Sequence, residues 1–339
     1  MKAFILTAGL GTRLRPFTEK VAKPAIEFLT LPMFAYSTYP MEQMGINDFI
    51  MNTHHLPETL QHTVNETLKN TNVSFSHEPE ILGSAGGIGH AKNLLSGSGD
   101  FFVLNGDTVN LFGDVNVFSE LKTQHDKNDS YATLLLMPHP EAGKSLSAAW
   151  VNPDGSIAGF GKSSPKGGAK PYHFVGSILF AERSLADMPT AFANTLTDVI
   201  MPAAKRGERV DSYICESVMF GETGNISDYL EYQKKCLHHL YANDSWGKYL
   251  RDILNYYRPG WRLLDAKLAA EQNLPLEDGG LLLIHDSSQL ILKNGGALVG
   301  HISVGPKCCV EANSSLDNVS IGGGVHLKLS NPLSNSIIL

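Results

Sequence analysis

Short apolar runs alternate with helical patterns from residue 2 to about residue 230, and this alternation restricts the fold more than any other feature. Strands that alternate with helices predict a parallel sheet that helices cover on both faces. Ligands bind such sheets at the loops that follow the carboxyl ends of the strands. The expected strands are Lys2–Thr7, Asp48–Asn52, Val73–His77, Phe101–Leu104 and Tyr131–Met137, and the expected helices are Pro32–Met44, Pro57–Lys69, Ala85–Leu95 and Val117–His125.

A six-residue repeat replaces this pattern near the carboxyl terminus. Apolar residues recur at every sixth position, the phase slips once by one residue, and glycine or asparagine fills the corners. This period suits neither a helix nor a simple sheet, but it is typical of a parallel β-helix, in which short strands stack rung upon rung. A loose β-meander is the alternative. The repeated positions are Leu292, Leu298, Val304, Val310 and Leu316, then Ile321, Leu327, Leu333 and Leu339.

These two patterns divide the chain into three predicted parts. A catalytic domain covers residues 1–235, a helical connector covers 236–283, and a short hexapeptide-repeat-like β-helix covers 284–339. The connector is polar and rich in aromatic residues, with a helix-like piece at Gly247–Tyr257 that ends before Pro259. We expect it to pack between the two domains.

Composition excludes several classes of partner. A net charge of −7 argues against nucleic acid held by a basic face. The sequence contains no apolar run long enough for a membrane-spanning helix. The opening segment Met1–Ala8 is only faintly similar to a signal peptide, so we interpret it as a buried strand. Four cysteines form no C-x-x-C pair, and without an export signal we expect a reducing cytoplasm.

A glycine-rich turn follows the first expected strand directly. Its residues are Ala8-Gly9-Leu10-Gly11-Thr12-Arg13, and glycine allows backbone N–H groups to approach a phosphate closely. The turn is not a Walker A loop, because no Gly-Lys-Ser/Thr follows, and it lacks the third glycine of the dinucleotide-binding pattern. Arg13 and Lys23 place two cations near the turn, which suits the handling of a triphosphate.

The run Gly9-Leu10-Gly11-Thr12-Arg13-Leu14, followed by Lys23-Pro24, resembles the amino-terminal signature of the sugar-phosphate nucleotidyltransferases. Within this family, the sequence looks most similar to members that resemble mannose-1-phosphate guanylyltransferases or that act as uridylyltransferases. The resemblance implies an α/β, Rossmann-like domain with a mixed, mainly parallel sheet and a C-terminal left-handed parallel β-helix. It also implies that Arg13 holds the departing pyrophosphate and that Lys23 neutralises the phosphates.

A second loop, Leu82-Gly83-Ser84-Ala85-Gly86, resembles the element with which family members hold the base and ribose. The resemblance implies that the glycines let backbone groups reach the base edge and that Ser84 offers a hydroxyl. Glu78 precedes this loop, and a carboxylate only accepts hydrogen bonds. That favours guanine, which presents two neighbouring donors, although uracil offers one. The alternative is a strand-to-helix turn with Ser84 as the N-cap.

Two acidic positions match the magnesium ligands of the family. Asn105-Gly106-Asp107 ends a buried strand, and an aspartate at the carboxyl end of a parallel strand is placed to ligate Mg²⁺. Asn105 is counted with the nucleotide-binding residues. The segment Glu222–Tyr229 aligns with a D-x-G-T-P-x-D-Y element, so Glu222 replaces the usual aspartate with one more methylene.

Three positions are candidates for the sugar site. Phe174-Val175-Gly176 resembles the family's F-x-G strand, whose glycine lies beside the sugar. Lys162 is a candidate for the sugar phosphate or a plain surface lysine, because the glutamate of the usual Phe-x-Glu-Lys-Pro is missing. Thr197-Asp198 resembles a T-D pair near the sugar, and a helix N-cap is the alternative.

Together these matches predict a magnesium-dependent enzyme that joins a nucleoside triphosphate to a sugar 1-phosphate and releases pyrophosphate. The attacking phosphate is already an anion, since its second pKa is about 6, so no general base is required. GTP with mannose 1-phosphate is the best guess, and UTP with an N-acetylated amino sugar 1-phosphate is the alternative. A non-catalytic nucleotide-sugar-binding homologue, and an acyl-transferring β-helix with His301 or His326, stay open. We expect the β-helix to mediate self-association.

Overall fold

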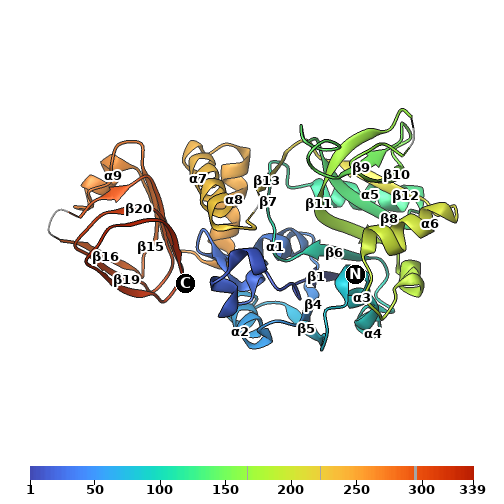
Figure 1. Cartoon of the computed structure of the whole chain (residues 1–339), viewed down its shortest axis with the longest axis horizontal. Helices are drawn as coiled ribbons and strands as arrows, with labels where there is room; N and C mark the ends of the chain where they lie inside the picture. The colour runs from blue at the N-terminus through green and yellow to red at the C-terminus, as the bar shows by residue number, and fades with distance from the viewer. Residues whose placement is uncertain (166, 222, 294–295) are drawn as a thin grey trace. The chain divides into compact units, whose positions relative to one another are not determined.

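The computed structural model describes residues 1–165, 167–221, 223–293 and 296–339 of the chain. They form two compact units, each built from separate stretches of sequence (Figure 1). The predicted division at residues 235 and 283 stays a prediction. The first unit holds Met1–Leu10, Ser37–Glu58 and Leu68–Phe220, and the second holds Gly11–Tyr36, Thr59–Thr67 and Gly221–Leu339.

A mixed sheet forms the centre of the first unit, in the order β10-β9-β11-β6-β1-β4-β5, with β8 paired to β11 and β12. Strands β6, β1, β4 and β5 are parallel, and β11 runs antiparallel to β6, β8 and β9. The predicted α/β class and mixed sheet are confirmed. The strands are β1 Lys2–Leu6, β4 Asp48–Thr53, β5 Asn72–His77, β6 Phe101–Asn105, β8 Ala132–Met137, β9 Ala148–Val151, β10 Ile157–Gly161, β11 Lys170–Phe180 and β12 Val210–Ile214.

The helices lie close to the predicted ranges, with one exception. The single helix expected at Ala85–Leu95 is wrong, because α3 ends at His90 and a separate α4 spans Lys92–Leu95. Four of the eight residues of α3 are glycine, and each glycine costs a helix about 1 kcal/mol relative to alanine. The other helices are α1 Ala35–Gln43, α2 Pro57–Thr67, α5 Val117–Asn128 and α6 Met201–Lys205.

The central strands are buried on both faces. Ala3, Phe4 and Ile5 of β1 are fully buried, and Phe101 of β6 stacks on Phe180 of β11 with ring centroids 5.6 Å apart. Strands covered on both faces are continuous apolar runs instead of alternating patterns. That burial explains why the sequence shows these strands as short apolar blocks.

Parallel strands stack through the C-terminal part of the second unit and form two sheets. In the first sheet Ser303 pairs with Ser320, and Ser320 pairs in turn with Ile337. Antiparallel β14 extends this sheet. The first sheet contains β14 Trp261–Leu264, β15 Leu281–His285, β17 Leu298–Val299, β18 His301–Val304, β20 Leu316–Ile321 and β22 Leu333–Ile338, and the second contains β16 Gln289–Leu292, β19 Cys309–Ala312 and β21 His326–Leu329.

The six-residue repeat marks the core of this stack. Val304 and Val310 are fully buried, as a stack of equal phases requires. Leu298 pairs with Leu316, which is three repeats further along the chain, and Leu316 pairs with Leu333, three repeats further across the slip in phase. Each rung of this part of the stack therefore uses three repeats. Stacked parallel strands are present, and the left-handed parallel β-helix stays a prediction.

Two helices precede the C-terminal coil of the second unit, which consists of the stacked strands from β15 to β22. Helix α7 spans Ile226–Ala242 and α8 spans Ser245–Tyr257, which confirms the helix expected at Gly247–Tyr257. The Asp244 carboxylate caps α8 by accepting a hydrogen bond from Gly247 N at 3.0 Å. A short α9 at Ala266–Ala270 follows β14.

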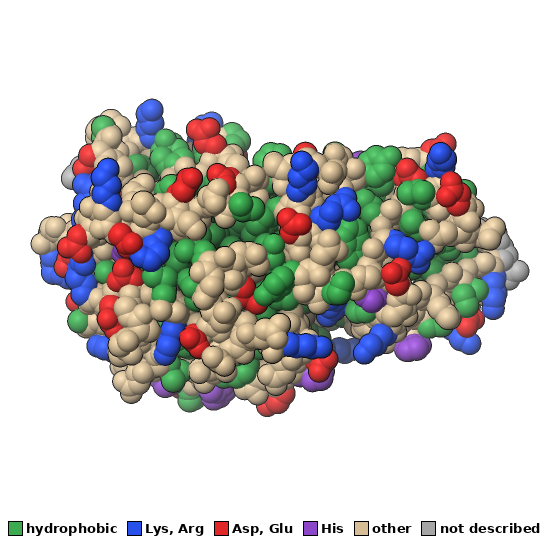
Figure 2. Space-filling view, turned by 180° about the vertical axis from the view of Figure 1, so that it is seen from behind, with side chains coloured by type: hydrophobic (Ala, Val, Ile, Leu, Met, Phe, Trp, Pro, Cys, Tyr) green, Lys and Arg blue, Asp and Glu red, His purple; other side chains and the backbone are tan. Residues whose placement is uncertain are grey.

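Helices of membrane-spanning length and apolarity do not occur among the described residues. Figure 2 shows that acidic and basic side chains are interspersed on the face it presents. The charge of that face is therefore mixed.

Candidate functional site

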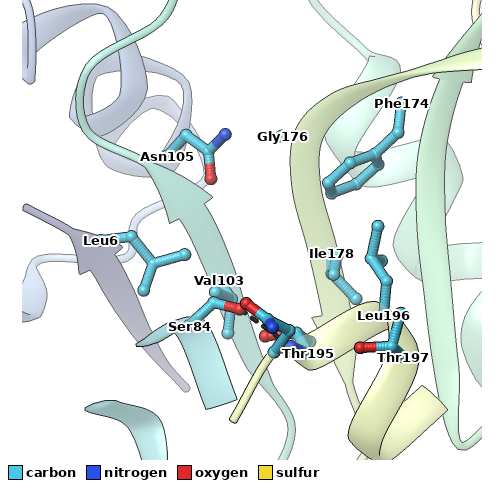
Figure 3. A pocket seen from close by; sticks show the side chains of 11 residues that line it. Leu6, Ser84, Val103, Asn105, Phe174, Gly176, Ile178, Thr195, Leu196 and Thr197 are labelled. Atoms are coloured by element: carbon cyan, nitrogen blue, oxygen red, sulfur yellow. Dashed lines mark hydrogen bonds between the residues drawn. The ribbon is translucent and has the colours of Figure 1, made fainter. Parts of the chain in front are cut away.

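A cavity of about 270 Å³ opens where β1 and β6 end (Figure 3). The chain continues from β1 to β4 on one side of β1 and returns to its other side at β6, so the strand order reverses here. Open α/β sheets bind ligands at such a reversal. Leu6 and Asn105, the last residues of the two strands, both line the cavity. The remaining lining residues are Ser84, Val103, Phe174, Gly176, Ile178, Asn194, Thr195, Leu196 and Thr197.

The lining of the cavity is mostly apolar and includes a few polar groups. Phe174, Ile178 and Leu196 form the apolar wall, and the Asn105 amide lies across the opening from Phe174 (Figure 3). Small-molecule sites typically combine a mostly apolar lining with a few polar groups that orient the ligand. The cavity therefore has the composition of a ligand site.

A β-bulge brings Gly176 against Asn105. The pairing of β11 with β8 shifts between Phe174 and Ile178, and Gly176 has a φ of +84°. A Cβ at Gly176 would lie only 2.6 Å from Asn105 Nδ2. Glycine is therefore required both by the backbone conformation and by the amide beside it. The structure thus brings together two residues that were predicted from separate motifs.

Ser84 holds the edge of the cavity through its hydroxyl. Thr195 N donates a hydrogen bond to Ser84 Oγ at 2.8 Å. The N-cap of α3 is Leu82, without a side-chain cap, so the alternative in which Ser84 is the N-cap is wrong. Ser84 lies inside the first turn of the helix and lines the cavity.

A turn of π-helix, Thr195–Ile200, supplies further lining residues. Such turns are rare and are often found at functional sites. Asp198 Oδ2 accepts a hydrogen bond from Asn194 N at 2.7 Å, so its carboxylate closes the start of this turn. Of the predicted Thr197-Asp198 pair, Thr197 lines the cavity and Asp198 does not, and the N-cap of this turn is Asn194, so the alternative in which Thr197 or Asp198 is the N-cap is wrong.

The glycines of α3 serve packing within the first unit. Gly83 has a φ of +72°, and a Cβ there would lie 2.5 Å from the carbonyl oxygen of Ala193. A Cβ at Gly86 would overlap the carbonyl oxygen of Ala191. The loop motif predicts that these glycines let backbone groups approach a base. In the structure they allow the helix to contact the backbone of the segment that leads into the π-helix.

Glu78 is buried beneath the same loop. Glu78 is only 1% exposed. Its Oε1 accepts a hydrogen bond from Asn52 Nδ2 at 2.7 Å, and its Oε2 accepts a hydrogen bond from Leu82 N at 3.0 Å. Both carboxylate oxygens therefore hold the loop in place. A Glu78 carboxylate that is buried and bonded in this way does not support the preference for guanine that was predicted from it.

The turn that carries Asp107 lies against the end of β1. A Cβ at Gly106 would lie 2.5 Å from Thr7 Cγ2, so only glycine allows the two segments to approach. Asp107 is half-buried in this turn. Ala8 and Gly9 continue from Thr7, and a Cβ at Gly9 would meet no described atom within 4 Å. The first predicted loop and the Asp107 turn thus leave adjacent strands at the same sheet edge.

The second unit carries the rest of the first loop. Gly11 has a φ of +60°, and a Cβ there would lie 2.9 Å from Lys23 Cβ and 2.8 Å from Thr18 Cγ2. Thr12 is exposed and begins a 3-10 turn, Thr12–Leu14. Lys23 is 8% exposed. Gly11 and Lys23, which belong to the two halves of the signature, are therefore packed directly against each other.

Arg13 lies beside the segment that resembles the family's second metal element. A Cβ at Gly224 would lie 3.0 Å from Arg13 Cζ, so the guanidinium packs on the glycine backbone. Arg13 itself is exposed. Glu222, the expected second metal ligand, lies outside the described residues.

Comparison with known proteins identifies the family. Residues 2–146 match the family model described as nucleotidyl transferase. Over its whole length the chain is 25% identical to the probable mannose-1-phosphate guanylyltransferase 2 of Oryza sativa subsp. japonica, of which it covers 86%. The mannose-1-phosphate guanyltransferase of Schizosaccharomyces pombe is 28% identical over 68% of this chain and 62% of its own length. Residues 2–146 therefore match the nucleotidyl transferase family, in agreement with the resemblance of the amino-terminal signature.

The fold of this nucleotidyltransferase agrees with that assignment. The solved structure of UDP-glucose pyrophosphorylase from Acinetobacter baumanii matches 75% of this chain and 98% of its own, with a TM-score of 0.57 and 20% identity. At that identity the match shows the fold alone. The family predicted from the amino-terminal signature is confirmed.

Some predicted residues of the nucleotidyltransferase are absent from the cavity wall. Lys162 is exposed just after β10 and is not among the lining residues. Asn194, Thr195 and Leu196 line the cavity but were not predicted from the sequence. Their signal in the sequence is slight, since a short π-helical turn has no apolar period of its own. Only the neighbouring Thr197-Asp198 pair pointed to this segment.

The donor chemistry of Asp107 fits a magnesium ion. Mg²⁺ is held through one or two carboxylates and the phosphates of its substrate, and Asp107 offers one carboxylate in a half-buried turn. Among residues 1–165, 167–221, 223–293 and 296–339, no three histidine, cysteine, aspartate or glutamate side chains gather as a metal site. A protein cage is thus absent from the described residues.

Proposed function

We propose that this nucleotidyltransferase transfers a nucleoside monophosphate from a triphosphate to a sugar 1-phosphate, with release of pyrophosphate. The observation that carries the proposal is the cavity at the reversal of strand order, which Ser84, Asn105 and Gly176 all line. The similarity of the whole chain to 86% of a protein named probable mannose-1-phosphate guanylyltransferase 2 supports the same reaction class.

GTP and mannose 1-phosphate are the proposed substrates. The rice and fission-yeast relatives both carry names that state guanylyl transfer to mannose 1-phosphate. The cavity suits a sugar ring, because a pyranose presents C–H groups to an apolar wall and hydroxyls to polar groups. Phe174 and Leu196 belong to the apolar wall, and Asn105 and Thr197 are polar groups that can bond to the hydroxyls.

Arg13 and Lys23 are the proposed phosphate-binding cations. Arg13 is exposed, and its guanidinium lies on Gly224. Lys23 is held by the packing of its stem on Gly11. We assign the departing pyrophosphate to Arg13 and the neutralisation of the phosphates to Lys23. The backbone of Ala8, Gly9, Gly11 and Thr12 completes the triphosphate loop.

Asp107 is the proposed magnesium ligand, with Glu222 as the second. A bound Mg²⁺ would offset negative charge on the phosphates. The chain's own residues bind and orient the two substrates, since the sugar phosphate is already an anion near neutral pH. Positioning and charge neutralisation then account for catalysis without a general base.

For the C-terminal coil we propose a left-handed parallel β-helix that mediates self-association in the cytoplasm. Leu298, Leu316 and Leu333 pair in succession and are all positions of the six-residue repeat, which supports the hexapeptide type of β-helix. Light scattering at micromolar concentration tests the association, and a monomer there contradicts it.

Pyrophosphate release from the purified chain with Mg²⁺ tests the function. GTP, UTP, dTTP, ATP and CTP are crossed with a panel of sugar 1-phosphates, and GTP with mannose 1-phosphate is expected to react fastest. Asp107→Asn is expected to abolish turnover. Asp129→Asn is the matched control, because its carboxylate is 89% exposed and its φ of +46° suits asparagine. Nucleotide binding without turnover of any pair favours a regulatory protein instead.

A further inference from the structure

Glu27 joins three segments of the second unit that are far apart in the sequence. Its side chain is 15% exposed, and Oε1 accepts a hydrogen bond from Arg258 Nη1 at 2.5 Å. Oε2 accepts from the backbone N–H of Gly323 at 2.7 Å. Arg258 directly follows helix α8, and Gly323 lies in the turn between β20 and β21. One carboxylate therefore ties the amino-terminal segment to α8 and to the coil.

The corners of the coil leave space for this carboxylate. A Cβ at Gly305 would lie 3.0 Å from Glu27 Oε2, and a Cβ at Gly323 would lie 3.3 Å from Oε1. A Cβ at Gly322 would lie 3.5 Å from Oε2. Gly305 follows β18 and Gly322 follows β20, and these two strands pair with each other. Two neighbouring rungs thus open at the same place, and Glu27 occupies the resulting niche.

The backbone of Glu27 is held at the same point. Tyr229 of α7 is fully buried, and its hydroxyl donates to Glu27 O at 2.5 Å. The same Oη lies 3.1 Å from Ser320 Oγ, which lies 3.0 Å from Ser303 Oγ on the neighbouring rung. A connected polar network of this kind favours one arrangement, because a buried group that loses its partner still bears its desolvation cost.

Short, closed turns separate Glu27 from the phosphate-binding loop. Lys23–Ala25 forms a 3-10 turn, and Ile26 N donates to Lys23 O at 3.1 Å. The stem of Lys23 packs on Gly11 without room for a methyl group between them. A displacement of Glu27 is therefore passed to Lys23 and from there to Gly11.

We propose that Glu27 is a positioning residue through which the C-terminal coil sets the place of the phosphate-binding segment Gly11–Lys23. Its effect on catalysis rests on the function proposed above, whereas the coupling itself does not. Removal of Arg258 leaves a largely buried carboxylate with one donor fewer, and an uncompensated buried charge strongly disfavours the arrangement that contains it. The segment that carries Glu27 then loosens.

Three variants in the full-length chain test this coupling. Arg258→Met removes the charged donor, and Arg258→Lys keeps the charge. Arg262→Met is the matched control, since it removes another arginine of the same unit whose partners, Asp286 and Gln272, lie outside residues 11–36. The readouts are amide hydrogen exchange over residues 11–26 and the KM values for both substrates.

Arg258→Met is expected to speed exchange at Leu14, Ala25 and Ile26, whose N–H groups close the turns of the loop. We expect the KM for the triphosphate to rise about fivefold or more while the KM for the sugar 1-phosphate stays within about twofold. A mere loss of folded protein changes neither KM. Arg258→Lys is expected to retain most of the wild-type protection from exchange and most of the wild-type triphosphate affinity, and Arg262→Met is expected to leave the loop unchanged.

Unchanged exchange over residues 11–26 in Arg258→Met overturns the coupling, whatever the activity. An active enzyme whose triphosphate KM does not respond overturns it as well. If the wild-type chain turns over no substrate pair, the proposed function fails, and faster exchange in Arg258→Met alone still supports the coupling. The two proposals therefore fail through different observations.

Discussion

Replacing Gly176 by alanine should damage the substrate cavity far more than it damages the fold. Gly176 has a φ of +84°, and a non-glycine residue in the left-handed region costs about 1–2 kcal/mol. The new Cβ would lie 2.6 Å from Asn105 Nδ2, whereas ordinary contacts begin at 3.4 Å. The Asn105 amide must therefore move by about 0.8 Å, and displacements of about 1 Å in a site cost up to about 100-fold in rate.

Gly155→Ala separates the two contributions. Gly155 also has a φ of +84°, but a Cβ there would meet no described atom within 4 Å. It lies in the turn between β9 and β10 of the same unit. The backbone cost is therefore shared by both variants, and the clash with Asn105 belongs to Gly176→Ala alone.

The assay is pyrophosphate release as a function of sugar 1-phosphate concentration, with thermal melting of each variant in parallel. We expect both variants to melt a few degrees below wild type, and only Gly176→Ala to lose about 10- to 100-fold in kcat/KM, equivalent to about 1.4–2.7 kcal/mol. Equal kcat/KM values for Gly176→Ala and Gly155→Ala would refute the assignment of Asn105 to the site.

Three further outcomes are expected. Ser84→Ala leaves Thr195 N without its acceptor and should cost about 1 kcal/mol of stability while raising the KM for the sugar 1-phosphate; a wild-type melting temperature contradicts this. Gly11→Ala forces a methyl group against Lys23, so triphosphate binding measured by calorimetry should weaken about tenfold or more. Burial lowers the pKa of His301 from 6.5 to about 4. The unfolded chain then binds the proton more readily between these values, so stability should fall by up to about 3 kcal/mol as pH drops from about 6.5 to about 4, and His301→Gln should flatten that dependence in melting experiments.

The sequence was most informative where one physical cause dominated. Buried strands such as Phe101–Asn105 can be recognised in the sequence as apolar runs because both faces of the sheet are covered. The fully buried positions Val304, Val310 and Leu316 produce a period that only a stack of rungs requires. Even the single slip in phase has a counterpart in the structure, since Leu316 pairs with Leu333 across it.

Residues from three predicted motifs, Ser84, Asn105 and Gly176, line one cavity, but other residues of these motifs make contacts within the protein. Glu78 and Gly83 lie in the expected loop, yet both serve contacts within the protein. Residue types alone do not distinguish a glycine that admits a ligand from one that admits a neighbouring carbonyl group. That distinction depends on the segment around Ala193, which is remote from the loop in the chain.

The cavity residues that were missed share a different cause. Leu6, Val103 and Ile178 line the cavity as ordinary strand residues, and their sequence pattern is that of the core. The bulge at Gly176 and the π-helical turn from Thr195 form other parts of the cavity wall. Both are local departures from regular periods, and hydrophobic periodicity contains no information about them.

The hydrogen bond from Gly323 to Glu27 joins residues 296 positions apart, which gives the phosphate-binding segment a place in the order of biosynthesis. Ribosomes add about 5–20 residues per second, so Gly323 is synthesised roughly 15–60 s after Glu27. All strands of the first unit have been synthesised once the chain reaches Phe220, so this unit can fold as it emerges from the ribosome. The segment that bears Arg13 and Lys23 must wait for the coil, so the nascent chain acquires the proposed phosphate-binding cations last.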